Sequence, residues 1–192
     1  RDVDSAAQLA ASFGYPVAMK LQAASLTHKS DVGGVILGIK DEAALRAGWQ
    51  RLMDTAQVHI PEGGLDGILI EKMAPPGLEL VLGGRNDPEW GSFVIFGLGG
   101  VWVEALDAVE MLPAHASRAQ ILDRLHQMRG AKLLGPFRGQ PARDVEAVAD
   151  AILALGAILR AHPEIREVDV NPMTVFAKGE GVMALDALFI TE

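Results

Sequence analysis

The chain has 192 residues, of which 49% are hydrophobic and 22% are charged, so its composition is that of a globular protein with a substantial core. A net charge of −8 argues against nucleic acid as a main partner, because phosphate backbones bind to basic surfaces. The absence of cysteine excludes disulfides, zinc–thiolate sites and cysteine nucleophiles, and no apolar run approaches the roughly 20 residues that span a membrane. We therefore expect a cytoplasmic protein with neither a nucleic-acid nor a membrane partner.

Helical and extended patterns alternate in the first part of the chain. A short helix is expected to begin at Asp4 or Ser5 and to end at Gly14, because these residue types cap and terminate helices. The other elements expected here are strands over residues 16–21, 35–40 and 67–73 and an amphipathic helix over residues 41–56.

The part of the chain after Pro75-Pro76-Gly77 is richer in strands. Proline and glycine of this kind interrupt regular structure, so we expect a boundary here and two α+β lobes, residues 1–73 and 74–192. Ser117 and Gln120 stand at capping-box spacing at the start of a helix. The elements expected are strands over 78–84, 92–100 and 101–106, a turn over 85–91, helices over 117–130 and 143–163, and a hairpin of 167–177 and 182–190.

A His-Lys pair and two consecutive glycines precede the second strand. His28 and Lys29 are followed by Gly33 and Gly34, and the apolar strand begins directly afterwards. Glycine lets backbone N–H groups approach an anion closely, a neighbouring lysine adds positive charge, and a histidine can accept or pass a group. A tight turn with exposed polar residues explains the same pattern, so both interpretations remain open at this point.

Three oxygen-bearing side chains fall in the expected C-terminal hairpin. Asp169 and Asn171 are two apart on one strand, so they share a face. If the turn is centred near Gly179, Asn171 lies almost opposite Asp186. Carboxylate and amide oxygens are the ligands that Mg²⁺ prefers, and Mg²⁺ commonly shares its shell with substrate phosphates. The alternative is that these residues only start and end strands and that Asn171 shapes the turn before Pro172.

Other charged and glycine-rich positions are weaker signals. Lys20 interrupts an apolar strand, so it faces either solvent or an anion in a cleft. Glu71 and Glu79 flank the expected joint and could accept hydrogen bonds from an amine or from ribose hydroxyls, or be plain surface charges. Gly99 and Gly100 belong to a second glycine-rich stretch that matches neither the Walker A loop nor the dinucleotide fingerprint.

Together these signals predict a cleft between the two lobes that holds a phosphate-rich ligand and Mg²⁺, since phosphoryl transfer needs little beyond positioning and charge neutralisation. His28 would be the group able to accept a phosphate there. We interpret the remaining histidines as surface residues on helices or loops: His59, His115, His126 and His162.

Four stretches of the sequence together resemble one enzyme family. In this order, residues 14–45, 77–104, 130–152 and 164–187 resemble the ATP-grasp domain of nucleoside-diphosphate-forming acyl-CoA synthetases, of the acetate–CoA ligase (ADP-forming) type. The family is related to succinyl-CoA synthetases. The resemblance covers nearly the whole chain and implies an ATP-grasp fold, with two α+β lobes and the nucleotide cleft between them.

The resemblance implies an acid–thiol ligase that makes an acyl-CoA from an acid, CoA and ATP, or runs in reverse to make ATP. In this family a phosphate travels through histidines, an acyl phosphate forms on a companion CoA-binding module, and the ATP-grasp domain handles the nucleotide. The implied cofactors are ATP/ADP and Mg²⁺. The implied partner is a CoA-binding module, in cis or as a separate subunit, so we expect the isolated domain to be inactive.

The resemblance also implies roles for residues of this chain. His28 would be the second phosphate carrier, Lys29 would steady the phosphoryl group, and Lys20 would contact nucleotide phosphates. Glu79 would face the ribose. The further implied sets are Ser30, Asp31, Gly33 and Gly34 in a mobile phosphate loop, Glu71, Lys72 and Met73 in an adenine-facing hinge, Gly99 and Gly100 among the cofactor-binding residues, and Asn171 and Asp186 on Mg²⁺ with Asp169 beside them.

Two features depart from the family pattern. The family usually has another stretch, including a strand of the first lobe, before the position of residue 1, so we expect the first lobe to be N-terminally incomplete. The family also tends to carry an arginine where this chain has Met111, and losing a cation near the phosphate path reduces stabilisation of developing charge. Met111 therefore points to an alternative function, a non-catalytic nucleotide-sensing regulatory domain of a multidomain protein acetyltransferase. The intact set of His28, Lys20, Asn171 and Asp186 points against that alternative.

Overall fold

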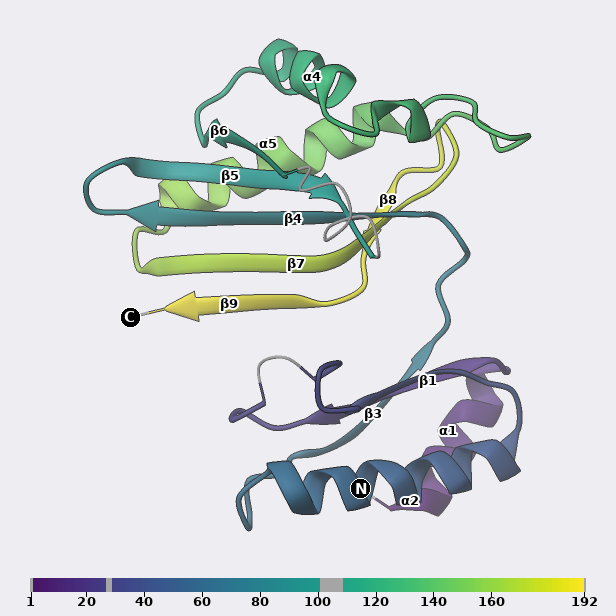
Figure 1. Ribbon diagram of the computed structural model, residues 1–192. Coiled ribbons are helices and arrows are strands. Elements are labelled where there is room, and N and C mark those ends of the chain that lie inside the picture. Colours follow the sequence, from purple (N-terminus) through teal and green to yellow (C-terminus); the bar gives the residue numbers. More distant parts are fainter. Residues whose placement is uncertain (1, 27–28, 101–108, 192) are drawn as a thin grey trace. The chain divides into compact units, whose positions relative to one another are not determined.

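The computed structural model describes residues 2–26, 29–100 and 109–191 (Figure 1). The chain divides into two compact units, Arg1–Pro75 and Pro76–Glu192. Each unit has its own hydrophobic core. None of the helices within the described ranges combines the length and the apolar content that a membrane crossing requires.

The first unit is a three-stranded antiparallel sheet with two helices on one side of it (Figure 1). The order of the strands across the sheet is β2-β1-β3, so β1 is central. The elements are α1 (Val3–Phe13), β1 (Val17–Gln22), β2 (Val35–Ile39), α2 (Glu42–His59) and β3 (Gly67–Lys72). The strands and helices predicted for this part of the chain are therefore confirmed, with ends that differ by a few residues.

One face of β1 forms the centre of the first core. Val17, Met19 and Leu21 are fully buried, as expected for alternate residues of a strand. They belong to the same cluster as Leu45 of α2. Lys20 lies between these positions in the sequence, so its side chain points to the opposite face of the sheet, away from the helices.

The start of α1 differs from the prediction. Asp2, not Asp4 or Ser5, is the N-cap, and its carboxylate accepts a hydrogen bond from the Ser5 amide at 2.8 Å. Asp4 lies in the first turn, where its negative charge is favourable beside the helix N-terminus. The predicted end of the helix at Gly14 is confirmed, since Gly14 is the C-cap and has a φ of 78°.

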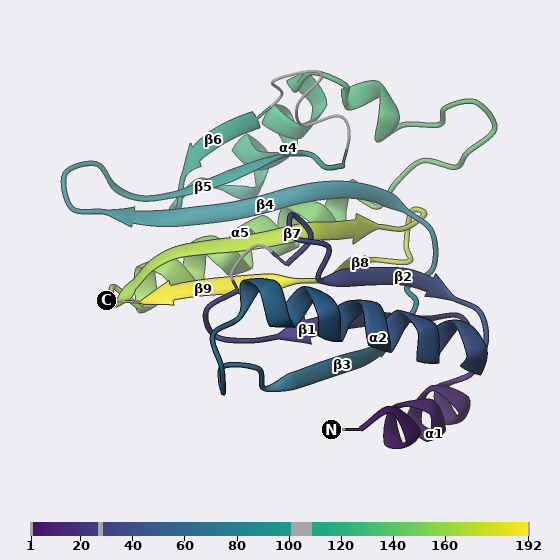
Figure 2. The ribbon, with the colours of Figure 1, turned by 60° about the horizontal axis from the view of Figure 1, so that its bottom comes forward.

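The second unit is an antiparallel sheet of six strands with helices on one face (Figure 2). The main order across the sheet is β6-β5-β4-β7-β8, and β9 also pairs with β7. The elements are β4 (Leu78–Asp87), β5 (Gly91–Leu98), β6 (Val109–Pro113), α4 (Arg118–Gln127), the 3-10 helix η1 (Ala131–Leu133), α5 (Val145–Ala161), β7 (Ile165–Val175), β8 (Val182–Ala184) and β9 (Ala187–Thr191).

The second core lies between the sheet and the helices α4 and α5. Phe96 of β5 is its largest fully buried side chain, and it lies in one cluster with Leu125 of α4 and Ile152 of α5. The predicted capping box at the start of α4 is confirmed, because Ser117 and Gln120 each bond the backbone of the other.

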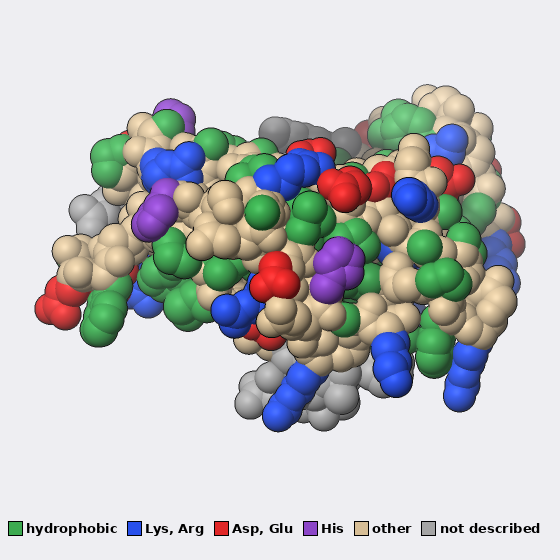
Figure 3. Space-filling view, turned by 90° about the horizontal axis from the view of Figure 1, so that it is seen from above, with side chains coloured by type: hydrophobic (Ala, Val, Ile, Leu, Met, Phe, Trp, Pro, Cys, Tyr) green, Lys and Arg blue, Asp and Glu red, His purple; other side chains and the backbone are tan. Residues whose placement is uncertain are grey.

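The outer side of α4 and α5 is a charged surface. Arg118 joins the two helices through Glu146, at 2.7 Å, and through Asp150. The space-filling view of this side shows acidic and basic side chains adjoining one another (Figure 3). Exposed pairs of this kind contribute little to stability. The histidines predicted to be surface residues are exposed, which confirms that interpretation: His59, His115, His126 and His162.

The connection between β4 and β5 is shorter than the predicted turn over 85–91. β4 continues to Asp87, because Arg85 pairs with Phe93 of β5 and with Glu167 of β7 and is thus held on both sides. The sequence reads as a turn because Asn, Asp and Pro are turn formers, but pairing with two neighbouring strands overrides that local preference.

The strand pattern after β5 also differs from the prediction. The strand expected over residues 101–106 lies outside the described residues. β6, Val109–Pro113, was not predicted. The stretch 182–190 was expected to form one strand, but it is divided at Leu185 and Asp186 into β8 and β9, which both pair with β7.

Asp144 fastens the β7–β8 turn to the start of α5. It is 8% exposed, and its carboxylate accepts hydrogen bonds from the amides of Gly181 at 2.9 Å, Gly179 at 3.0 Å and Ala147 at 3.2 Å. The bonds from Gly181 and Gly179 hold the β7–β8 turn, and the bond from Ala147 caps the first turn of α5. The Gly181 amide is the largest cause that lowers the pKa of the Asp144 carboxyl, while burial acts in the opposite direction.

Replacing Asp144 by asparagine is expected to destabilise the protein by about 2 kcal/mol at pH 7, because the neutral amide cannot accept all of these bonds. Since the pKa is lowered in the folded state, the stabilisation is complete above the unfolded-state value of about 3.9 and is lost as the pH falls through the folded-state value. Urea unfolding at several pH values between about 7 and 2 measures this. The difference from the wild type should shrink at the acid end.

Asp123→Asn is the matched control for this experiment. Asp123 accepts a hydrogen bond from Gln127 on the exposed side of α4, so its replacement should change stability by no more than about 0.5 kcal/mol. An Asp144→Asn variant as stable as the Asp123→Asn control at pH 7 would contradict the role of the clamp.

Candidate functional site

Lys20 and Glu71 form an ion pair on the face of the first sheet that points away from its helices. The Lys20 Nζ and Glu71 Oε2 atoms are 2.7 Å apart, and the two side chains are 13% and 35% exposed. The register pairs Lys20 with Leu69 and Ala18 with Glu71, so the two charged residues are diagonal neighbours on adjacent strands. The structure thus brings together two residues that the sequence singles out separately.

Exposed apolar side chains share this sheet face with the ion pair. Leu69 lies opposite Lys20 on β3 and is 40% exposed, and Leu37 on β2 is 63% exposed. Leu37 belongs to the same face because Val35, two residues earlier, pairs with Lys20. A partly apolar surface with a few placed polar groups is the usual character of a small-molecule site.

The segment before β2 is a closed turn. The Gly34 amide donates to the Lys29 carbonyl at 2.7 Å, and the Gly33 amide donates to the Ser30 carbonyl at 3.1 Å. Gly33 has a φ of 73°, a conformation that other residues rarely adopt. A Cβ on Gly34 would lie 2.8 Å from the Lys29 carbonyl oxygen, so both glycines are required by the backbone.

The side chains of this turn differ in burial. Ser30 and Asp31 are exposed at its tip, whereas Lys29 is half-buried at its base. His28, the predicted phosphate carrier, lies outside the described residues. The described part of the turn has polar side chains at its tip and glycines at the strand entrance, an arrangement that fits both interpretations of the sequence.

The predicted hinge residues stand at the end of the first unit. Glu71 and Lys72 are the last residues of β3, and Lys72 pairs with Val17 at the start of β1. Met73 follows the strand and is half-buried. Of the three, Glu71 makes a specific side-chain contact, the ion pair with Lys20.

Glu79 and the glycine pair Gly99-Gly100 lie together in the second unit. The Gly99 amide donates to the Glu79 carbonyl at 2.7 Å. Gly100 has a φ of 61°, and a Cβ there would lie 3.1 Å from Glu79 Oε2. The structure therefore places the Glu79 side chain beside this glycine-rich stretch, a contact that the sequence did not reveal.

Asn171 and Asp186 face each other across the hairpin, as predicted. The backbone amide of Asn171 donates to the backbone carbonyl oxygen of Asp186 at 3.2 Å. β7 has a bulge at this point, because Leu80 pairs with Met173 while Leu82 pairs with Val170. Asn171 and Pro172 thus oppose a single residue of β4, and bulges of this kind re-aim side chains.

The chemistry of this cluster suits a hard divalent cation. Asn171 is exposed and Asp186 is half-buried, with one carboxylate oxygen accepting from the Ala187 amide at 3.0 Å. Asp169 pairs with Leu188, so it stands one step further along the same pair of strands. Among the described residues no three His, Cys, Asp or Glu side chains gather closely enough to hold a metal ion. A cation here would take an amide oxygen, carboxylate oxygens and the remainder of its shell from a ligand.

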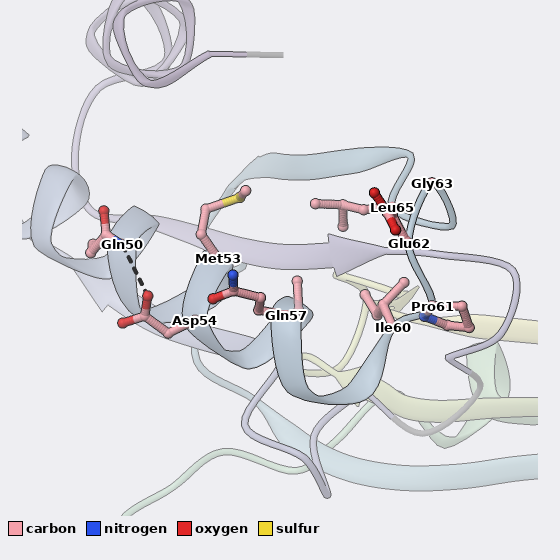
Figure 4. A pocket seen from close by; sticks show the side chains of 10 residues that line it. Gln50, Met53, Asp54, Gln57, Ile60, Pro61, Glu62, Gly63 and Leu65 are labelled. Atoms are coloured by element: carbon pink, nitrogen blue, oxygen red, sulfur yellow. Dashed lines mark hydrogen bonds between the residues drawn. The ribbon is translucent and has the colours of Figure 1, made fainter.

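A separate hollow of about 610 Å³ lies beside α2 in the first unit (Figure 4). Met53 of α2 and Leu65 of the segment after the helix line it, and Gln50 at its edge donates to Asp54 at 2.9 Å. None of the residues predicted to bind nucleotide or metal lines this hollow. It therefore does not form part of the candidate site.

Asp144 is a residue of structural importance that the sequence reasoning did not single out. An aspartate directly before an amphipathic helix is an N-cap signal, so its contact with Ala147 could have been predicted. Its bonds to Gly179 and Gly181 join segments 35 and 37 residues apart, and no local pattern indicates them.

The ATP-grasp domain family matches residues 1–190 of the chain. The chain belongs to this family. The ATP-grasp fold that the sequence predicted is therefore confirmed, and with it the mixture of helices and antiparallel sheets.

Curated relatives of the chain are acyl-CoA ligases. A trans-feruloyl-CoA synthase of an unknown prokaryotic organism is 42% identical over 191 residues, which are 100% of this chain and 27% of that protein. Acetate–CoA ligase (ADP-forming) I of Archaeoglobus fulgidus is 35% identical and is matched over 95% of this chain and 27% of that protein. The beta subunit of acetate–CoA ligase (ADP-forming) I from Pyrococcus furiosus is 35% identical, over 99% of this chain and 81% of the subunit.

The chain thus spans about a quarter of the first two relatives, at 27% of their lengths.

Solved structures of related synthetases have the same fold as this chain. The dinucleotide-forming acetyl-coenzyme A synthetase 1 of Ca. Korarchaeum cryptofilum, in complex with coenzyme A and Ca-AMPCP, superposes with a TM-score of 0.91 at 33% identity, over 100% of this chain and 83% of that chain. Its complex with coenzyme A and Mg-AMPPCP gives a TM-score of 0.80 at 32% identity, over the same shares of both chains.

Replacing Gly34 by alanine is expected to open the turn before β2, because the added Cβ would collide with the Lys29 carbonyl at 2.8 Å. Faster hydrogen exchange at the Gly33 and residue-34 amides would report this opening. Gly135→Ala is the control, since a Cβ there meets its nearest atom at 3.7 Å. Unchanged exchange in the Gly34→Ala variant would show that the turn tolerates the methyl group.

Proposed function

We propose that this chain is the nucleotide-binding and phosphoryl-transferring domain of an ADP-forming acyl-CoA synthetase, an acid–thiol ligase. The observation that carries the proposal is the 35% identity to an acetate–CoA ligase beta subunit over 99% of this chain. The overall reaction would convert an acid, CoA and ATP into acyl-CoA, ADP and phosphate, or run in reverse.

The nucleotide would bind through groups on both units. Lys20 would neutralise phosphate charge, and its place beside Glu71 on the sheet face that points away from the helices supports this role. Glu79 would accept hydrogen bonds from the ribose. The other contributing residues would be Lys29, Ser30, Asp31, Gly33 and Gly34 in the phosphate loop, Lys72 and Met73 with Glu71 at the adenine, and Gly99 and Gly100 beside Glu79.

Asn171 and Asp186 would hold Mg²⁺, with Asp169 beside them. The backbone bond between Asn171 and Asp186 and the oxygen character of all three side chains support this assignment. When bound, the ion would neutralise phosphate charge. The protein's own contribution would be to keep Asn171 and Asp186 adjacent, and the β7 bulge beside Asp186 supports this.

His28 would act as the phosphate carrier. Its imidazole would take the phosphoryl group as the bond to the leaving oxygen breaks and a P–N bond forms, which leaves ADP. A structure of the Korarchaeum synthetase with its phosphohistidine segment pointing towards the nucleotide site supports a relay of this kind. Lys29 would steady the transferred group.

A CoA-binding module, in cis or as a separate subunit, would complete the enzyme. The occurrence of relatives both as a longer protein and as a beta subunit supports either arrangement. Feruloyl-CoA and acetate–CoA ligases both match this domain along nearly its whole length, so we infer that acid selectivity resides mainly in that module. A cytoplasmic location belongs to the proposal, because ATP and CoA are available there.

Removal of the Asp186 carboxylate should weaken Mg²⁺-dependent nucleotide binding. In the full-length protein, calorimetric titration with ADP in the presence and absence of Mg²⁺ should show a loss of roughly tenfold or more for Asp186→Ala, only when Mg²⁺ is present. Asp123→Ala, which removes an exposed carboxylate from α4, should bind as the wild type does. Equal Mg²⁺-dependent affinity in the Asp186→Ala variant would contradict the metal assignment.

Replacement of His28 by alanine should abolish phosphoryl transfer while nucleotide binding is retained. We expect turnover of the complete enzyme to fall by roughly 10³-fold or more, and acid-labile phosphate to disappear after incubation with γ-labelled ATP. His126→Ala, on the exposed side of α4, is the control. Wild-type turnover in the His28→Ala variant would exclude the relay.

Met111 favours a second candidate function, nucleotide sensing without catalysis. It lies on β6 opposite Ile95 and is 57% exposed, so an uncharged side chain stands where the family tends to carry arginine. The two candidates differ in the same labelling experiment. A sensing domain of a protein acetyltransferase would bind nucleotide and form no acid-labile phosphate in the wild type.

A further inference from the structure

The connection between η1 and α5 carries a tight turn with an unusual residue at its tip. Phe137 and Gln140 exchange both backbone hydrogen bonds, at 2.9 and 3.2 Å, which leaves Arg138 and Gly139 as a two-residue loop. Arg138 has a φ of 47° and Gly139 has a φ of 81°. Within the described ranges, Arg138 is the non-glycine residue with a positive φ. We refer to residues 137–140 as the Phe137–Arg138 turn.

The turn extends away from the body of the second unit. Figures 1 and 2 both show the segment between α4 and α5 reaching beyond the ends of the helices. Residues 136–141 are all exposed. The base of the segment is nevertheless fixed, because the Arg143 amide donates to the Leu134 carbonyl at 2.8 Å and the Lys178 amide donates to the Ala142 carbonyl at 2.9 Å. The tip is therefore a projection on a hydrogen-bonded base.

An arginine at this position is not the residue that the turn geometry favours. Two-residue hairpin loops with positive φ at both positions prefer Asn, Asp or Gly, and a bulky residue there costs of order 1 kcal/mol. The Arg138 guanidinium lies 5.5 Å from the centroid of the Phe137 ring, in cation–π contact. The cation–π contact favours one arrangement of the Phe137 and Arg138 side chains. Asn, Asp or Gly would adopt the positive φ of position 138 with less strain.

The segment that carries this turn and the backbone paired with its base hold four cationic residues, in a chain whose net charge is −8. Arg143 bridges Ala177 in the backbone, so Lys178 lies close to it. Within the described part of the chain, no carboxylate forms an ion pair with any of the four cationic side chains of this region: Lys132, Arg138, Arg143 and Lys178. The buried Asp144 nearby is already hydrogen-bonded to backbone amides. Glu180 is the exposed acidic residue of the adjacent turn.

We propose that the Phe137–Arg138 turn is a docking element for an acidic segment of the CoA-binding module, an inference that rests on the proposed function. Arginine and aromatic residues dominate the energetics of protein interfaces, and complementary charge favours an acidic partner on this basic projection. Small-molecule sites are concave, whereas this turn is an exposed projection, so a protein surface fits it better. The contact between Phe137 and Arg138 orders both side chains before binding, which reduces the entropy lost on docking.

Photo-crosslinking in the complete enzyme tests this contact. Phe137 is replaced by the photoreactive aromatic residue p-benzoylphenylalanine, the protein is irradiated at low salt, and crosslinked peptides are identified by mass spectrometry. We expect crosslinks to a segment of the CoA-binding module that is rich in Asp and Glu. Adding Arg138→Glu should lower the yield by roughly fivefold or more. Adding Arg51→Glu, on the exposed side of α2, should leave the yield unchanged.

Crosslinks confined to residues 1–192, crosslinks to a segment without acidic residues, or a yield that Arg138→Glu does not change would overturn the proposal. Calorimetric titration of the Arg138→Glu enzyme with ADP and Mg²⁺ separates this outcome from a failure of the proposed function. Nucleotide affinity within about twofold of wild type, together with no crosslinks to the module from position 137 while Arg138 is intact, or with a crosslink yield that Arg138→Glu does not change, rejects the docking element alone. Absence of nucleotide binding in the wild type, together with Arg138-dependent crosslinks to the module, rejects the nucleotide-binding role and keeps the docking element.

Discussion

The antiparallel pairing of β4 with β7 is the constraint on which the second unit depends. β4 pairs with β5 on its other side, so β7 enters the sheet next to a strand that precedes it by some 80 residues in the sequence. The register places Glu79 opposite Thr174 and Gly83 opposite Asp169. Glu79 and Asp169, two of the residues proposed to bind nucleotide and metal, therefore take their positions from one set of strand hydrogen bonds.

The bulge within that pairing shapes the backbone around Asn171 and Asp186. Because Asn171 and Pro172 oppose one residue of β4, the strand changes direction where it meets the Leu185–Asp186 break between β8 and β9. The Asp144 carboxylate holds the far end of the same hairpin to α5. The bulge in β7 sets the direction of the nearby side chains. The Asp144 hydrogen bonds hold the turn of the same hairpin.

In the first unit, Lys20 is a charged residue in the largely apolar strand β1. Val17, Met19 and Leu21 fill the core on one face of β1, so Lys20 must lie on the other. Its charge is compensated by Glu71 from the neighbouring strand, at 2.7 Å. Lys20 and Glu71 therefore lie together on the face that carries the exposed Leu37 and Leu69.

The sequence by itself determined the strongly periodic elements, such as β1 and α2, and the hairpin that opposes Asn171 to Asp186, because alternation, helix caps and turn glycines act over a few residues. Resemblance along the whole chain also identified the ATP-grasp family. Only the tertiary structure decided that β4 continues through Asn86 and Asp87, that Asp186 separates two strands, and that Lys20 meets Glu71. These features depend on partners 50 or more residues away or on neighbouring strands, whose hydrogen bonds and charges outweigh the local preferences that a sequence pattern records.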